Sequence, residues 1–505
     1  MLRASASALL VGISVSSCGA DPAPDALSPN VVSASPLAPC RPPGIEEELR
    51  CGSLTVFENR GSGSGRTIDL NVVVLPALAP SLAGAPLFEL AGGPGIAATG
   101  AAALYVTEMR EYRRHRDVVL VDQRGTGGSN PLHCPHERSP QSFLEEMYPV
   151  QYVETCREEL EARADLTQYT TPIAADDLDD VRTWLGYEQI NLLGVSYGTR
   201  AALVYLRRYP EHVRSAVLMG VSPTDHKAPL HHARDGQRAM DLLLADCAAD
   251  HDCGRAFPEV GRELVEVLEA LGRRPARVQY VLPETGAKVS LEIRREVFAE
   301  KLRSRLYDPH NARRLPAVIH HAALGNFDPF LELVLPQTRT DPDFIADGMY
   351  LSVTCAEDTA LIDPAEAARL GAGTFFGGYR VFQQRRACGL WPRGTLPDDY
   401  HRAVESSRPV LVISGFMDPV TPPAWGAKVA GHLPNSLHVV IPHHAHIPAG
   451  LSRMECLDGL TMEFLRRGSV EGLDASCVDQ MLPPPFVVEA APSSRAESRG
   501  VSLEE

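Results

Sequence analysis

The chain has 505 residues, of which 44% are hydrophobic and 22% are charged, so it can bury a large core and has the composition of a soluble globular protein. Its formal net charge of −16 argues against nucleic acid and anionic membrane surfaces as partners, because both would repel it.

Residues 1–18 have the pattern of an export signal. Arg3 supplies a positive charge, and the apolar stretch of small residues that follows to about residue 15 is too short to span a bilayer. The stretch ends in Val15-Ser16-Ser17-Cys18, which resembles the signal of bacterial lipoproteins, where the cysteine becomes the lipidated first residue. A cleaved secretory signal is the alternative. Either signal predicts an exported protein, lipid-anchored or periplasmic in the cell envelope, or secreted.

Ten cysteines remain besides Cys18, an even number that an oxidising compartment favours. Metal binding is the alternative, but no compact C-x-x-C pairs occur with clustered histidines, so we expect disulfides and no metal site. Sequence alone does not determine the connectivity. Pairing neighbours in chain order gives Cys40–Cys51, Cys134–Cys156, Cys247–Cys253, Cys355–Cys388 and Cys456–Cys477.

The folded part begins near residue 40. Residues 19–39 are rich in Pro, Ala and Ser without periodicity, which predicts a flexible linker. Two β-rich runs at 53–57 and 68–74, separated by a glycine-serine segment, predict a hairpin. Short runs that are apolar at every position predict strands buried on both faces, as in a parallel sheet, and they occupy residues 86–90, 117–121 and 190–193.

Alternation of strands and helices continues through the rest of the chain. Helices are expected at 174–185 and 199–208, and a strand at 213–219. Residues 224–402 change to helical stretches, such as 235–247 and 262–271, broken by Pro- and Gly-rich turns. Further strands are expected at 409–414 and 437–441, and residues 483–505 resemble a disordered tail.

This order predicts an α/β fold with a mostly parallel central sheet, helices on both faces and a mainly helical cap inserted before the last strands. The expected divisions are a core in two parts, 40–223 and 403–482, with the cap at 224–402. The carboxyl edge of the sheet, where such folds place their ligands, would lie beneath the cap.

Ser196 is the candidate nucleophile. It is the central residue of Gly194-Val195-Ser196-Tyr197-Gly198, a G-x-S-x-G sequence between a predicted strand and a predicted helix. That setting is the one in which glycines allow a strained turn to hold a serine hydroxyl above the sheet edge. An ordinary structural turn is the alternative.

A nucleophilic serine needs a base, and the base needs an orienting acid. In this fold the acid follows a later strand and the histidine comes last. Asp418 follows the strand predicted at 409–414, so it is the candidate acid. The next strand leads to three histidines, His443, His444 and His446, and spacing does not choose among them.

Two backbone N–H groups would bind the oxyanion formed during acyl transfer. One is expected from Tyr197, directly after the nucleophile. The other is expected from Gly93 in Gly92-Gly93-Pro94-Gly95, because this glycine-rich loop follows an earlier strand and allows close backbone approach.

Together these motifs resemble the proline iminopeptidase and tripeptidyl aminopeptidase family of α/β-hydrolases, with its TAP-like C-terminal region. The resemblance runs from about residue 40 to residue 477. The matching segments are Gly92-Gly93-Pro94-Gly95, Asp122-Gln123-Arg124-Gly125-Thr126-Gly127, Tyr169-Thr170-Thr171, Asp177-Leu178-Asp179, Gly194-Val195-Ser196-Tyr197-Gly198-Thr199, Cys355-Ala356-Glu357-Asp358, Cys388-Gly389-Leu390-Trp391-Pro392 and Asp418-Pro419-Val420-Thr421-Pro422.

The resemblance implies particular roles. It selects His446 as the base, although the family's Gly-His-Gly is replaced here by Ala445-His446-Ile447. It implies that Asp122 and Arg124 organise a turn near the site without reacting. It also suggests Glu357 and Asp358 as carboxylates for the free ammonium group of a peptide substrate.

The leading interpretation is a serine hydrolase that cleaves amino acids or short peptides from the N-terminus of peptides through an acyl-enzyme, without metal or organic cofactor. A carboxylesterase or lactonase using the same triad is the alternative, because the fold and the triad do not determine the leaving group. An inactive binding protein on a hydrolase scaffold is a third interpretation, against which the intact candidate triad counts.

Overall fold

The computed structural model describes residues 27–80, 84–135, 139–283, 285–335 and 344–488. Five disulfides join Cys40–Cys51, Cys134–Cys156, Cys247–Cys253, Cys355–Cys388 and Cys456–Cys477, the pairs that neighbours in chain order suggested. Within the described ranges no helix has both the length and the apolar character needed to cross a membrane. Residues 1–18, including Cys18, lie outside the described residues, as does the tail from residue 489.

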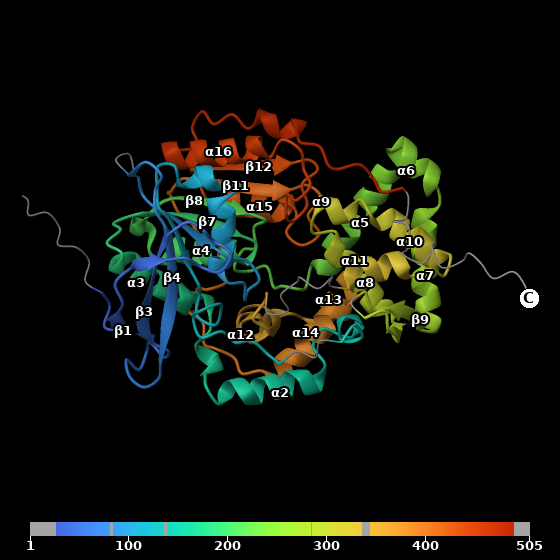
Figure 1. Cartoon of the computed structure of the whole chain (residues 1–505), viewed down its shortest axis with the longest axis horizontal. Coiled ribbons are helices and arrows are strands. Elements are labelled where there is room, and N and C mark those ends of the chain that lie inside the picture. Colours follow the sequence, from blue (N-terminus) through green and yellow to red (C-terminus); the bar gives the residue numbers. More distant parts are fainter. Residues whose placement is uncertain (1–26, 81–83, 136–138, 284, 336–343, 489–505) are drawn as a thin grey trace, which may run out of the picture.

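A mostly parallel sheet of ten strands forms the centre of the molecule (Figure 1). Its parallel part has the order β6-β5-β7-β8-β11-β12. These strands are β5 (Leu87–Leu90), β6 (Val118–Val121), β7 (Ile190–Val195), β8 (Val213–Met219), β11 (Val410–Gly415) and β12 (Ser436–Ile441). β6 and β11 are buried at every position, as runs without polar alternation require when helices cover both faces of a sheet.

An antiparallel extension completes the other side of the sheet. It contains β1 (Val31–Ala34), β2 (Ala38–Cys40), β3 (Leu49–Phe57) and β4 (Thr67–Leu75), of which β4 pairs with β6. The residues before Cys40 thus differ from the expected linker, because β1 and β2 both pair with β3. Backbone hydrogen bonds to β3 hold β1 and β2 in the sheet. Such bonds form without an alternating hydrophobic pattern in the paired strand.

Helices pack on both faces of the sheet. One face is covered by α3 (Thr171–Trp184), α4 (Tyr197–Arg208) and α15 (Pro423–Ala430), whose apolar residues share a core with β5, β7 and β8. The other face is covered by α1 (Ala102–Val106) and α16 (Met454–Arg467), which share a second core with the opposite side chains of the same strands. This is the α/β-hydrolase arrangement that the sequence predicts.

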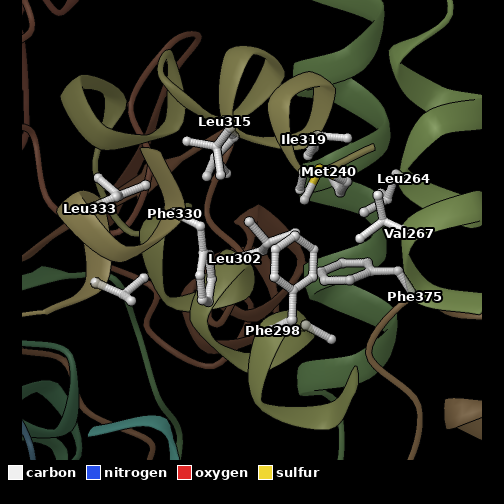
Figure 2. Packing of buried hydrophobic residues seen from close by; sticks show 14 of the residues in the cluster. Met240, Leu264, Val267, Phe298, Leu302, Leu315, Ile319, Phe330, Leu333 and Phe375 are labelled. Carbon is white, nitrogen blue, oxygen red and sulfur yellow. The ribbon is translucent and has the colours of Figure 1, made fainter. Parts of the chain in front are cut away.

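The insertion between β8 and β11 begins with a region that has its own hydrophobic core, drawn in Figure 2. α7 (Val260–Arg273) contributes Val260, Leu264, Val267, Leu268 and Leu271, the spacing of one helix face. The other elements are α5 (His232–Ala249), α6 (His251–Ala256), β9 (Ala276–Val281), β10 (Lys288–Ile293), α8 (Arg295–Arg305), α9 (Pro309–Ala312), α10 (Leu315–Ala323) and α11 (Asp328–Val334). The β9–β10 hairpin was not expected, although Ala276, Val278 and Tyr280 alternate with polar residues and pack, half-buried, against this core.

The later part of the insertion packs on the core domain. α12 (Asp347–Glu357) and α14 (Tyr379–Leu390) share a hydrophobic cluster with α2 (Val150–Glu161) and with Tyr197 at the start of α4. α13 (Pro364–Gly371) lies between them in sequence. The insertion expected as one cap therefore contains two parts. One surrounds the core of Figure 2, to which Phe375 and Phe376 of the later part also contribute, and the other is attached to the sheet domain.

Candidate active site

Ser196 lies between the end of β7 and the start of α4, in a left-handed backbone conformation with φ 56° and ψ −123°. Such a conformation is uncommon for a residue with a side chain and marks a sharp, strained turn. Glycines are required around it. A Cβ added at Gly194 would lie 2.5 Å from the carbonyl oxygen of Gly198, and one added at Gly198 would overlap the carbonyl oxygen of Leu90. The turn places Ser196 at the amino terminus of α4.

The glycine-rich loop after β5 lies against this turn. A Cβ added at Gly92 would be 3.3 Å from the Cβ of Ser196. Gly93 has φ +109°, and a Cβ there would be only 2.6 Å from the backbone nitrogen of Gly95, so a side chain would be strained. The structure therefore brings together the loop and the serine that the sequence predicts as partners.

Asp418 and His446 form a hydrogen-bonded pair at the same edge of the sheet. Asp418 follows β11 and His446 follows β12, and Asp418 Oδ2 lies 2.8 Å from His446 Nδ1. The backbone N–H of Ser196 donates to the carbonyl of Met219 at 2.9 Å. The next residue, Gly220, lies so close to His446 that an added Cβ would be 3.2 Å from its Cε1. Ser196 and His446 thus approach the same point at the end of β8.

The other two histidines of the loop have different surroundings. His444 is buried, its Nδ1 contacts the carbonyl of Ala445, and burial lowers its pKa to about 4, so it is neutral at pH 7. His443 lines a small hollow with Met417 and Ala445, near the start of α9. Of the three, His446 is the one that contacts Asp418.

Asp418 is fully buried, and its carboxylate accepts four hydrogen bonds. The N–H groups of Val420 and Thr421 donate to Oδ1 at 2.8 Å each, and the hydroxyl of Thr421 donates to Oδ2 at 2.8 Å, beside the bond to His446. Burial alone would raise the pKa of Asp418, but the charge of His446 and these donors outweigh it and lower the pKa to about 2. The group is therefore an anion at neutral pH.

Two residues that sequence reasoning missed complete the surroundings of His446. The Thr421 hydroxyl also lies 3.2 Å from His446 Nδ1. Tyr307, after α8 in the cap, accepts the backbone N–H of His446 at 2.9 Å through its carbonyl, and its ring packs edge-on against the imidazole at 5.0 Å. The Asp-Pro-Val-Thr spacing could have indicated Thr421, because threonine three residues after an aspartate often closes a local turn. No sequence signal connects Tyr307 with His446.

Glu357 and Asp358, at the end of α12, are both buried and already have partners. Asp358 makes a bidentate ion pair with Arg200 of α4, at 2.8 and 2.9 Å. Glu357 accepts the backbone N–H of Thr171 at 2.7 Å and its hydroxyl at 2.8 Å, together with the hydroxyl of Tyr400. Burial raises the pKa of Glu357, against the charge of Arg200. These carboxylates connect α12 to α3 and α4.

Asp122 and Arg124 organise the turn after β6. Asp122 accepts the backbone N–H and the hydroxyl of Thr99, at 2.9 and 3.0 Å, and the backbone N–H of Gly128 at 2.9 Å. The buried guanidinium of Arg124 pairs with both oxygens of Asp177, at 2.6 and 2.8 Å. Arg124 also donates to the backbone carbonyls of Glu58 and Gln168, at 2.8 and 3.0 Å, so both side chains hold backbone segments near the turn.

Two family models and several known proteins match this chain. Residues 91–253 match the model of the alpha/beta hydrolase fold, and residues 374–477 match the model of TAP-like proteins. The serine protease Hip1 of Mycobacterium tuberculosis is 25% identical over 487 residues, covering 87% of this chain and 90% of that protein. The tripeptidyl aminopeptidase of Streptomyces lividans is 30% identical over 266 residues, 46% of this chain and 48% of that protein.

Two further similar proteins carry other names, a carboxylesterase and a proline iminopeptidase. A carboxylesterase B of Mycobacterium tuberculosis is 26% identical over 473 residues, covering 85% of this chain and 86% of that protein. The solved structure of a proline iminopeptidase from Mycobacterium smegmatis matches with 19% identity and a TM-score of 0.36, over 82% of this chain and 98% of that chain. The strand order, the turn at Ser196 and the two matching models carry the assignment. This chain has the α/β-hydrolase fold, and its C-terminal region matches the TAP-like proteins.

Proposed function

We propose that this protein is an exported serine hydrolase that removes amino acids or short peptides from the N-terminus of peptide substrates. The observation that carries the proposal is the strained turn at Ser196 beside the buried pair of Asp418 and His446. Serine on such a turn, with a histidine oriented by a carboxylate, is the arrangement that activates a hydroxyl for acyl transfer.

The first half of the reaction forms an acyl-enzyme. His446 Nε2 takes the proton of Ser196 Oγ as that oxygen attacks the substrate carbonyl. The resulting oxyanion accepts hydrogen bonds from the N–H groups of Gly93 and Tyr197, and it lies at the positive end of α4. When the tetrahedral intermediate collapses, His446 gives the proton to the leaving amine.

Water completes the second half. His446 takes a proton from water, the hydroxide attacks the acyl carbon, and the proton returns to Ser196 as the acid product leaves. Asp418 remains an anion throughout, because its pKa is held near 2, and it stabilises the imidazolium that forms in each half. No metal or organic cofactor enters this scheme.

Peptide substrates are favoured by the relatives named serine protease and tripeptidyl aminopeptidase. An aminopeptidase also needs a carboxylate for the substrate's ammonium group, and Glu357 and Asp358 are the family-based candidates. Both have internal partners, so an ammonium group would have to share Glu357 with Thr171 and Tyr400, or Asp358 with Arg200. This competition, together with the relative named carboxylesterase B, favours an esterase as the second candidate function.

Export is supported by the five disulfides, which persist mainly in oxidising compartments, and by the signal-like pattern of residues 1–18. The lipid anchor at Cys18 belongs to the same proposal. Mass spectrometry of the protein from cell envelopes would detect a diacylated or triacylated Cys18, whereas an N-terminus created by cleavage elsewhere would exclude the anchor.

The test is hydrolysis of a matched substrate panel by the purified protein. The panel contains aminoacyl and tripeptidyl arylamides with a free amine, their N-acetylated forms, and simple p-nitrophenyl esters. We expect cleavage of the free-amine arylamides and a loss of at least about 10⁴-fold in kcat for Ser196→Ala. Cleavage of the esters alone, still dependent on Ser196, would reject the peptidase and leave the esterase. Activity that persists in Ser196→Ala would reject the catalytic assignment itself.

A further inference from the structure

A basic pocket lies at the opposite edge of the sheet from Ser196. It has a volume of about 290 Å³ and is lined by the segments that precede β5 and β6, by the start of β8 and by the end of α16. Figure 1 shows the arrowheads of β11 and β12 directed toward the cap, so the amino ends of the parallel strands lie on the far side. The pocket is therefore separated from the candidate active site by the length of the strands.

Arg116 is a nearly buried cation in the wall of this pocket. Its residue surface is 8% exposed, and no hydrogen bond or ion pair to its guanidinium occurs among the residues that the structure describes. Burial, followed by the nearby charge of Arg214, lowers the pKa of Arg116 to about 10, so it remains protonated at pH 7. Its nitrogens are not among the fully buried atoms without a partner in the described chain, so the unpaired charge reaches the pocket and is only partly hydrated there.

Arg214 adds a second cation without a carboxylate partner in the described part of the chain. Its guanidinium donates to the carbonyl oxygens of Leu465 and Arg466, at 2.7 and 3.1 Å, and to Asn191 Oδ1 at 3.2 Å. These neutral acceptors hold the guanidinium in place and leave its charge uncompensated. His115, also in the wall, has a buried Nδ1 without a hydrogen-bond partner in the described structure.

No carboxylate lines the pocket among the described residues, and two carboxylates next to its lining residues in sequence are occupied elsewhere. Glu463 pairs with Arg466 at 2.7 Å and with Arg467 at 2.6 Å, on the outer side of α16. Asp117, next to Arg116, accepts the backbone N–H of Ala77 at 2.8 Å and the hydroxyl of Tyr187 at 2.7 Å. Neither hydrogen-bonds or pairs with Arg116 or Arg214 in the described structure, so the two cations point to an anion from outside the chain.

We propose that this pocket binds a small tetrahedral oxyanion, with Arg116 as the principal ligand and Arg214 as the second. Guanidinium groups bind phosphate and sulfate oxygens through parallel N–H donors, and they do so best where the charge is partly desolvated. The ligand is a phosphate group, either as the free ion or as a lipid headgroup. The net charge of −16 repels an anionic surface more than a small ion, and so favours the free ion.

The experiment is isothermal titration calorimetry of the purified full-length protein with sodium phosphate, at constant ionic strength in chloride buffer. We expect one saturable site, and an affinity at least about tenfold lower for Arg116→Gln, which removes the charged donors. Arg114→Gln is the matched control. It makes the same charge change two residues away, on an exposed side chain already paired with Glu111, and should bind phosphate like the wild type.

The source of the phosphate group is tested by sedimentation with phosphatidylglycerol vesicles, with phosphatidylcholine vesicles as reference. Binding to phosphatidylglycerol alone that Arg116→Gln abolishes would identify a lipid headgroup as the ligand. Arg116→Lys keeps the charge but loses the parallel N–H donors of the guanidinium, so it should bind phosphate with intermediate affinity. This variant replaces Arg116→Gln in the test if the glutamine variant is unfolded. The proposal is overturned if neither free phosphate nor these vesicles bind, or if the Arg116 variants bind as well as the wild type.

Discussion

At the scale of single residues, the orientation of His446 depends on Asp418 Oδ2, an oxygen that accepts two hydrogen bonds. Asp418 Oδ2 accepts both the imidazole Nδ1–H and the Thr421 hydroxyl, while Oδ1 is held by two backbone N–H groups. The backbone bonds place the carboxylate, and the Thr421 hydroxyl selects the position of the oxygen that faces the histidine. In the proposed mechanism Thr421 would therefore act through Asp418 and His446, as a positioning residue.

Replacing Thr421 by valine keeps the shape of the side chain and removes only the hydroxyl. We expect kcat to fall about tenfold with KM nearly unchanged, because a hydrogen bond to a charged group is lost while the substrate contacts remain. Steady-state kinetics on the best arylamide or ester of the panel measures this change.

Thr421→Ser, which restores the hydroxyl, should recover most of the wild-type kcat. If the valine variant keeps the wild-type kcat, or if restoring the hydroxyl in the serine variant recovers none of the lost activity, the positioning role of the hydroxyl is wrong.

At the scale of elements, the turn at Ser196 depends on close contact between β5 and α4. Gly198 lies in the first turn of α4 against the carbonyl of Leu90, at the end of β5. The loop that contains Gly92 and Gly93 begins two residues later. The distance between the predicted oxyanion donors and Ser196 is therefore set by a contact that only glycine at position 198 allows.

Gly198→Ala should separate α4 from β5. We expect the free energy of unfolding to fall by about 1–3 kcal/mol, the usual cost of overpacking, and activity to be largely lost because Gly92 and Gly93 move away from Ser196. Urea unfolding followed by circular dichroism, together with the hydrolysis assay, measures both effects.

Gly389→Ala is the control, because Gly389 is also helical and an added Cβ there would meet no atom within 4 Å. This variant should be as stable as the wild type or slightly more so, since alanine favours helices. Equal stability and activity of the two variants would contradict the proposed contact.

At the scale of the whole molecule, the insertion before β11 is attached to the core domain through α12. The backbone N–H of Ala346 donates to the carbonyl of Gly95 at 2.9 Å, and that of Gly348 donates to Leu132 at 2.9 Å. The disulfide Cys355–Cys388 then joins α12 to α14. The predicted oxyanion loop and the end of α12, with Glu357, are thus held in one unit, separate from the core of the cap in Figure 2.

Removing the Cys355–Cys388 disulfide by a double serine substitution should lower both stability and activity. The disulfide closes a segment with a sequence separation of 33, for which chain entropy predicts a loss of about 3.7 kcal/mol in the free energy of unfolding. Activity should fall as well, because α12 supplies the bonds from Glu357 to Thr171. Urea unfolding and the hydrolysis assay are the measurements.

The Cys247–Cys253 disulfide provides the comparison. It joins α5 to α6 within the cap, and its sequence separation of 6 predicts a loss of about 2 kcal/mol. Its double serine variant should keep its activity. Equal loss of activity in the two double variants would show that α12 has no special connection to the site.

Local patterns in the sequence determined much of the fold and of the candidate site. Apolar runs without alternation predict buried parallel strands, because burial on both faces leaves no place for polar residues. The glycines around Ser196 predict a strained turn, because side chains would collide there. The order of serine, aspartate and histidine follows from the order of the strands, so Ser196 and Asp418 could be named from their neighbours in sequence.

The tertiary structure decided what depends on contacts between distant segments. Spacing in the sequence does not distinguish His446 from His443 and His444. The hydrogen bond to Asp418 does distinguish it. Tyr307 reaches His446 from the cap, and Arg116 meets Arg214 at the far edge of the sheet. Such contacts leave no mark in local hydrophobic periodicity, which reports only whether a segment has an apolar face. They are created when the sheet brings together the ends of strands far apart in the chain.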